Sequence, residues 1–89
     1  MHLSLGKVYA TPEALHIIEE AGHEAVEFIV KHNCCDWGDV CAEDRKLNDA
    51  AVLNGDRVLS AYTLRNGARV WVITEADRSY TTILLPHQY

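Results

Sequence analysis

The chain has 89 residues, of which 48% are hydrophobic and 24% charged, and 13 acidic side chains against 8 basic ones give a formal net charge of −5. This composition is typical of one small globular domain; it excludes a disordered chain and disfavours direct binding to nucleic acid. No apolar run approaches the roughly 18 residues of a membrane-spanning helix, and the first residues lack the layout of a secretory signal. We therefore expect a cytoplasmic protein that does not contact a membrane.

Residues 11–54 carry the patterns of helices. Thr11 suits the N-cap of a helix that begins at Pro12, because its side chain can accept a backbone N–H and proline lacks the N–H that would be unsatisfied there. Apolar residues then recur at helical spacing as far as Gly22. The same spacing predicts a second helix over residues 23–32.

A loop at residues 34–39 separates these helices from a third one. Asp39 is the predicted N-cap of this helix, which runs to about residue 53. Asn54 and Gly55 predict its left-handed end, because glycine adopts that conformation without steric cost.

From residue 57 onward the apolar pattern changes to the period of strands. Asn66 and Gly67 form the strongest short signal for a hairpin turn, since both positions of such a turn need a positive φ. The predicted strands are residues 57–65, 68–74 and 80–85, with residues 7–10 as a candidate fourth strand at an edge.

Together these elements predict a single α+β domain over residues 1–89. Neither the helical stripes nor the hairpin can bury their apolar faces alone. We therefore expect a two-layer sandwich, in which about three helices in residues 11–54 pack on a three-stranded antiparallel meander in residues 57–86. Ten of the acidic residues lie in residues 1–54, so the negative charge belongs to the helical part.

The loop after the second helix holds the main candidate binding site. It places Trp37 among carboxylates, and a tryptophan in a charged field is typical of residues that dominate the binding energy of an interface. The turn at residues 75–79 is a second candidate, because loops on rigid sheets often bind partners. The predicted partner-binding residues are Asp36, Trp37, Asp39, Glu43, Asp44 and Asp49 around the loop, and Glu75, Asp77 and Arg78 in the turn.

A structural interpretation stays open for both segments. Glu43 and Asp44 fall in the first turn of the predicted third helix, where negative charge stabilises the exposed N–H groups. Asp77 and Arg78 can pair within their own turn. An exposed Trp37 would favour binding, and an indole buried between helix and sheet would favour the structural interpretation.

A metal site is a weaker alternative. His32, Cys34, Cys35 and Cys41 bring soft ligands into a short stretch, but adjacent cysteines seldom bind one ion and the paired spacing of a structural zinc site is missing. Because the cysteines are odd in number and Cys34 and Cys35 are adjacent, we expect no disulfide framework. The glycines are isolated and form no phosphate-binding loop, and we expect no bound cofactor.

Several segments resemble a known group of proteins. They are residues 6–12 (GKVYATP), 36–39 (DWGD), 43–44 (ED), 48–49 (ND), 59–62 (LSAY), 70–79 (VWVITEADRS) and 81–86 (TTILLP). In these segments the chain is similar to small, uncharacterised bacterial proteins that are plasmid-related or carried by integrative mobile elements. The resemblance spans nearly the whole chain and implies a mobile-element protein, without implying an activity or a ligand.

We therefore expect a non-enzymatic accessory protein of a mobile genetic element that binds a basic protein partner through its acidic surface. A related alternative is an inhibitor of a host defence nuclease, of the anti-restriction or anti-CRISPR type, whose carboxylates imitate DNA phosphates. A third alternative is a small metal-dependent or thiol enzyme that uses Asp36, Asp39, Cys41 or His32. A homodimer is a further expectation, because so short a chain buries a small core.

Overall fold

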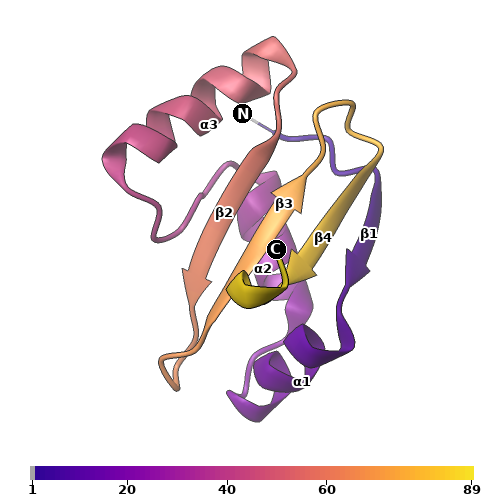
Figure 1. Cartoon of the computed structure of the whole chain (residues 1–89), viewed down its shortest axis with the longest axis vertical. Helices are drawn as coiled ribbons and strands as arrows, with labels where there is room; N and C mark the ends of the chain where they lie inside the picture. The colour runs from indigo at the N-terminus through magenta and orange to yellow at the C-terminus, as the bar shows by residue number, and fades with distance from the viewer. Residues whose placement is uncertain (1) are drawn as a thin grey trace.

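The computed structural model describes residues 2–89 and confirms the α+β class. In chain order the elements are β1 (Lys7–Ala10), α1 (Pro12–Glu20), α2 (Ala25–Asn33), α3 (Ala42–Asn54), β2 (Val58–Thr63), β3 (Arg69–Thr74), β4 (Tyr80–Leu84) and the short 3-10 helix η1 (Pro86–Gln88). Figure 1 shows the sheet from its open side, with α2 behind it. Within residues 2–89 no helix has the length and apolar character needed to cross a membrane.

The sheet has four strands in the order β1-β4-β3-β2. The predicted hairpin is confirmed as the antiparallel pair β2 and β3, and the next predicted strand is confirmed as β4. The predicted two-residue turn is wrong, because the Leu64 N–H donates to the Ala68 carbonyl at 2.7 Å and leaves a three-residue loop in which Gly67, but not Asn66, has a positive φ.

The candidate strand at residues 7–10 is confirmed as β1, at the edge of the sheet. The sheet nevertheless differs from a purely antiparallel three-stranded meander, because β1 pairs parallel to β4. Strands joined by a tight turn must pair antiparallel, as β2, β3 and β4 do. No such turn joins β1 and β4, so these two strands can pair in parallel.

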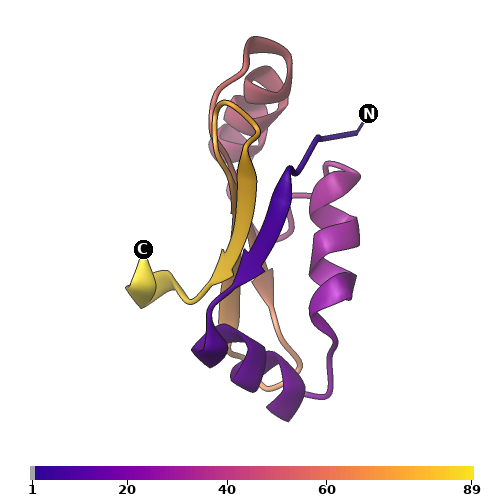
Figure 2. The ribbon, with the colours of Figure 1, turned by 90° about the vertical axis from the view of Figure 1, so that its right-hand side faces the viewer.

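The helices do not form one layer. In Figure 2 the sheet is seen edge-on, with α2 along one face, α1 at the lower end and η1 on the opposite side. The expectation that α3 packs on the sheet face with the other helices is wrong, because α3 lies beside the β2 edge (Figures 1 and 2). Only Asn48 and Ala51 of α3 are buried, which is too narrow an apolar stripe to cover a sheet.

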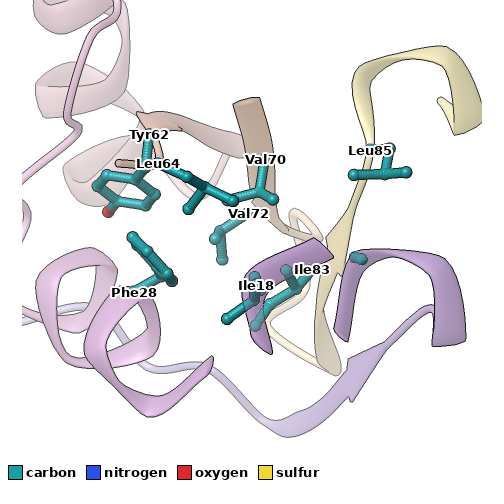
Figure 3. Packing of buried hydrophobic residues seen from close by; sticks show 9 residues of the cluster. Ile18, Phe28, Tyr62, Leu64, Val70, Val72, Ile83 and Leu85 are labelled. Carbon is teal, nitrogen blue, oxygen red and sulfur yellow. The ribbon is translucent and has the colours of Figure 1, made fainter. Parts of the chain in front are cut away.

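The main core fills the space between the sheet, α1 and α2. Figure 3 shows Phe28 of α2 and Ile18 of α1 pointing toward side chains of the strands. Alternate strand residues supply this face, because successive side chains of a strand point to opposite sides. The buried members are Ala14, Ile18, Phe28, Tyr62, Leu64, Val70, Val72, Ile83 and Leu85.

The helix ends follow the predicted chemistry with one exception. The Thr11 side chain accepts the Ala14 N–H at 3.1 Å and caps α1, and Gly55 ends α3 with φ of 77°. Asp39 does not cap α3 as predicted; Cys41 occupies that position and makes no capping hydrogen bond through its side chain. Asp39 is held instead by β2, where its carboxylate accepts the Thr63 hydroxyl at 2.7 Å.

Residues 37–39 close the β2 edge of the sheet. The Ala61 N–H donates to the Trp37 carbonyl at 3.1 Å, and the Asp39 N–H donates to the Ala61 carbonyl at 2.6 Å. Gly38 lies between them with φ of 73°, and a Cβ there would overlap the Ala61 carbonyl oxygen and lie 2.6 Å from the Tyr62 ring. Glycine is therefore required for the close approach of this segment to β2.

Candidate functional site

Trp37 lies inside the protein. Its side chain is 3% exposed and packs with Leu3, Ala51 and Val58, and its indole N–H donates to the Asp49 carboxylate at 2.9 Å. The prediction that Trp37 is an outward recognition residue is therefore wrong. The indole is the largest side chain in a second small core that joins α3 to the sheet, so its first role is structural.

The predicted carboxylates occupy different environments. Asp36, Glu43 and Asp44 are exposed around the start of α3, while Asp39 and Asp49 are exposed residues whose carboxylates accept hydrogen bonds from Thr63 and Trp37. Glu43 and Asp44 lie in the first turn of α3, where they face its free N–H groups. Two of these carboxylates, Asp39 and Asp49, thus bind other side chains of the fold, whereas Asp36, Glu43 and Asp44 face solvent.

The turn at residues 75–79 has a separate structural role. The Arg78 guanidinium donates to the carbonyl oxygens of Ala51 at 2.9 Å, Asp56 at 2.6 Å and Glu75 at 3.1 Å. Asp77 accepts the Ser79 N–H at 2.9 Å, and the hydrogen bonds from Ser79 lower the pKa of its carboxyl group. Arg78 therefore binds the C-terminal end of α3 to the β3–β4 turn, in keeping with the preference of helix C-termini for cations.

The weaker metal alternative, built on His32 and three cysteines, is not assembled. Both ring nitrogens of His32 are engaged, Nδ1 with the Ser60 hydroxyl at 2.5 Å and Nε2 with the Thr74 hydroxyl at 2.8 Å. Cys34 and Cys41 are exposed, and within residues 2–89 no three histidine, cysteine or acidic side chains are grouped closely enough to hold an ion. Burial raises the pKa of the Cys35 thiol, which disfavours the thiolate that binds metals.

His32 belongs to a directional chain of hydrogen bonds beneath α2. Thr81 donates to the Leu5 carbonyl at 2.8 Å, so Thr81 can accept from Thr74, whose hydroxyl lies 2.7 Å away. Thr74 then accepts from His32 Nε2–H, and His32 Nδ1 accepts from Ser60. These hydrogen bonds satisfy both nitrogens of a neutral imidazole. Burial, and to a lesser extent the nearby positive charge of Arg78, lowers the pKa of His32 to about 4.

Ser60 and His32 have the contact of a nucleophile with its general base, but no substrate can reach them. Both residues are 0% exposed, and they lie between α2 and the sheet. A nucleophile needs a free approach to its oxygen as well as a neighbouring base. We therefore assign this pair to the stability of the fold, and His32 is not accessible for the enzyme site of the third alternative.

An open groove lies between α3 and the open face of the sheet. One hollow of about 290 Å³ joins a second of about 210 Å³ through their common residues Asp44 and Leu59. We call the two together the α3 groove. Its lining residues are Asp39, Val40, Cys41, Asp44, Leu47, Asn48, Arg57, Leu59, Ala61, Arg69, Trp71 and Pro86.

The α3 groove combines an apolar floor with charged walls. Leu59 of β2 and Trp71 of β3 point to the open face of the sheet and are half-buried, and Leu47 of α3 is 66% exposed. Exposed Asp39 and Asp44 supply negative charge on the α3 side, while Arg57 and Arg69 supply positive charge from the sheet. Such a site suits a peptide segment with both an apolar and a charged side chain.

Sequence reasoning found the acids of this groove and missed its floor. Residues 70–73 are all apolar, so their pattern does not show which side chains face the open side. The observed register, in which Ala61 pairs with Trp71, places Leu59, Ala61 and Trp71 on one face. A two-residue turn at Asn66 and Gly67 would instead pair Trp71 with Tyr62 and turn its side chain to the other face. The floor therefore could not be found from the predicted turn.

Comparison of the chain with protein-family models, with curated proteins and with solved structures gives no match in any of the three.

Proposed function

We propose that the protein is a non-enzymatic accessory protein of a mobile genetic element, and that it binds a segment of a partner protein in the α3 groove. The observation that carries the proposal is the continuous apolar floor beside Asp39 and Asp44. The resemblance of the sequence to mobile-element proteins supplies the biological setting.

The chemistry of the groove suggests the character of the bound segment. An apolar side chain packed on Trp71 and Leu59 would bury area worth about 25 cal/mol per Å², and tryptophan is enriched among the residues that dominate binding. A lysine or arginine next to it would meet Asp39 and Asp44, and exposed Glu43 adds a third negative charge nearby. A partly apolar segment with a basic side chain at the α3 wall, away from Arg57 and Arg69, therefore fits best.

Mimicry of DNA is the second candidate function. Exposed Asp36, Glu43 and Asp44 support it, because an inhibitor of this kind presents carboxylates to a basic groove. Arg45 and Lys46 interrupt the series on α3, and both are exposed. Positive charges within the acidic surface would repel a DNA-binding groove, so the peptide-binding proposal is preferred.

The experiment compares partner capture by matched surface variants. Leu47→Ser removes the exposed apolar side chain from the groove, Asp44→Lys reverses a charge, and Leu53→Ser is the control, since Leu53 is 82% exposed on the same helix and does not line the groove. The expected result is that the two groove variants lose a protein captured by the wild type and by Leu53→Ser.

Binding should also weaken as salt rises from low to physiological concentration, because exposed charges are screened over about 10 Å. Equal capture by all variants would contradict the proposal. Release of the captured protein by duplex DNA would instead favour mimicry.

A further inference from the structure

The two edges of the sheet differ. Residues 37–39 cover the β2 edge, whereas β1 has β4 on one side only. The Lys7 N–H donates to the Ser79 carbonyl at 3.2 Å, and the Thr11 N–H donates to the Ile83 carbonyl at 3.0 Å. Because alternate residues of a strand direct their polar groups to opposite sides, the N–H and C=O groups of Val8 and Ala10 point away from β4.

Within residues 2–89 no other segment pairs with this outer side of β1. The side chains along it are also uncovered: Val8 is 47% exposed and Tyr9 is 53% exposed. Tyr9 makes an edge-on contact with Tyr80 of β4, with ring centroids 6.0 Å apart, and Tyr80 is itself 41% exposed. An open edge with apolar side chains is a template for another strand.

We propose that β1 pairs antiparallel with β1 of a second copy of this chain, about a two-fold axis that passes beside Tyr9. In this register Val8 lies opposite Ala10 of the second copy, and their outward N–H and C=O groups bond to each other. The two Tyr9 residues form the closely spaced pair that is not hydrogen-bonded, where cross-strand side chains interact most strongly. The two sheets then become one sheet of eight strands.

The charges around β1 favour a second copy of this chain as the partner, paired in the antiparallel direction. Residues 7–13 (KVYATPE) begin with Lys7 and end with Glu13, which is exposed in the first turn of α1. An antiparallel copy brings Lys7 opposite Thr11 of the other chain, within reach of Glu13, whereas a parallel copy would place Lys7 beside Lys7. The edge is therefore complementary to itself, as a two-fold interface requires.

The interface is small, so the dimer is weak. A four-residue strand is only about 13 Å long, and stable dimers bury about 800 Å² per partner. We expect a dissociation constant on the order of tens to hundreds of micromolar. The β1 edge lies across the sheet from the α3 groove, so pairing leaves the groove open and does not depend on the proposed function.

Sedimentation velocity over a range from micromolar to millimolar protein tests the proposal. The wild type should shift from monomer to dimer. Val8→Pro removes an N–H that the monomer does not use and should weaken dimerisation at least tenfold, whereas the matched variant Val8→Thr keeps the N–H and should dimerise as the wild type does. Hydrogen exchange should show the Val8 and Ala10 amides protected only at high concentration.

Charge exchange tests the register. Lys7→Glu and Glu13→Lys should each weaken the dimer about threefold or more, and the double variant should recover it. A chain that stays monomeric at millimolar concentration would refute the proposal. So would a dimer unaffected by Val8→Pro, because it would use a different surface.

Discussion

Protonation of His32 is expected to destabilise the domain at mildly acidic pH. The imidazole is 0% exposed and accepts a hydrogen bond at Nδ1 from Ser60. Burial, assisted by Arg78, lowers its pKa from 6.5 to about 4. Between these two values the unfolded chain binds a proton that the folded chain excludes.

The sign and size of the effect follow from this difference. Since the folded state binds fewer protons, stability is complete above the unfolded pKa of 6.5, falls as the pH drops toward 4, and is fully reduced below that value. One pKa unit corresponds to about 1.4 kcal/mol, so the total loss is about 3 kcal/mol, and about 2 kcal/mol of it occurs between roughly pH 7 and pH 5. In a domain of this size a loss of about 2 kcal/mol lowers the melting temperature by roughly 8–16 °C.

Urea unfolding at a series of pH values measures the slope. His32→Gln cannot be protonated in this range and should lose most of the slope, whatever its absolute stability, while His16→Gln is the control because His16 lies at the surface next to Glu20. The carboxyl groups of Glu27 and Asp77 also have lowered pKa values, from 4.5 and 3.8, and therefore add their losses at lower pH.

Titration of the His32 ring by NMR in the wild-type chain provides a direct reading if His32→Gln does not fold. Its midpoint should lie near pH 4. A midpoint near 6.5, or an unchanged slope in His32→Gln, would show that burial and the hydrogen bonds to Ser60 and Thr74 do not keep this imidazole neutral.

Three further predictions concern Gly38, Arg78 and the cysteines. Gly38→Ala should lower the free energy of unfolding by about 3–5 kcal/mol, since the added methyl group would overlap the Ala61 carbonyl. Gly67→Ala has open space at the methyl position and should lower it by about 1–2 kcal/mol. Urea titration of both variants checks the difference. Arg78→Ala should cost about 2 kcal/mol through the carbonyl groups it leaves unpaired, and a loss equal to that of the surface control Arg45→Ala would contradict its assigned role. In the native protein a thiol reagent should modify exposed Cys34 and Cys41 quickly and Cys35 slowly, because burial raises the pKa of Cys35; equal rates would show that Cys35 is accessible.

Local signals predicted most of the elements. Thr11 with Pro12, and Asn66 with Gly67, act through the backbone of their own segments, so the α1 start and the β2–β3 hairpin were found correctly. The parallel pairing of β1 with β4 depends on residues more than seventy positions apart. Nothing in either segment indicates its neighbour, because both strands are short and neither is followed by a tight turn.

The acidic motif at residues 36–39 shows why surface and structural roles are hard to separate in a sequence. Its charge indicates a solvent-facing loop, and Asp36 and Asp39 are indeed exposed. Its backbone, however, covers the β2 edge, and Trp37 fills the space behind it. Which strand edge needs a cover follows from the strand order, and that order is a property of the whole chain.

The same arrangement explains why the candidate site lies beside the motif rather than on it. Once residues 37–39 are bound to β2, the chain must leave the sheet before α3 begins, and α3 then runs beside the sheet instead of across its face. No α-helix covers the open-face side chains Leu59 and Trp71, which lie next to the acids at the start of α3; Trp71 is contacted there by the Tyr89 ring, 5.7 Å away between centroids. A more apolar α3 would cover this floor, so the polar sequence of α3 keeps the groove open.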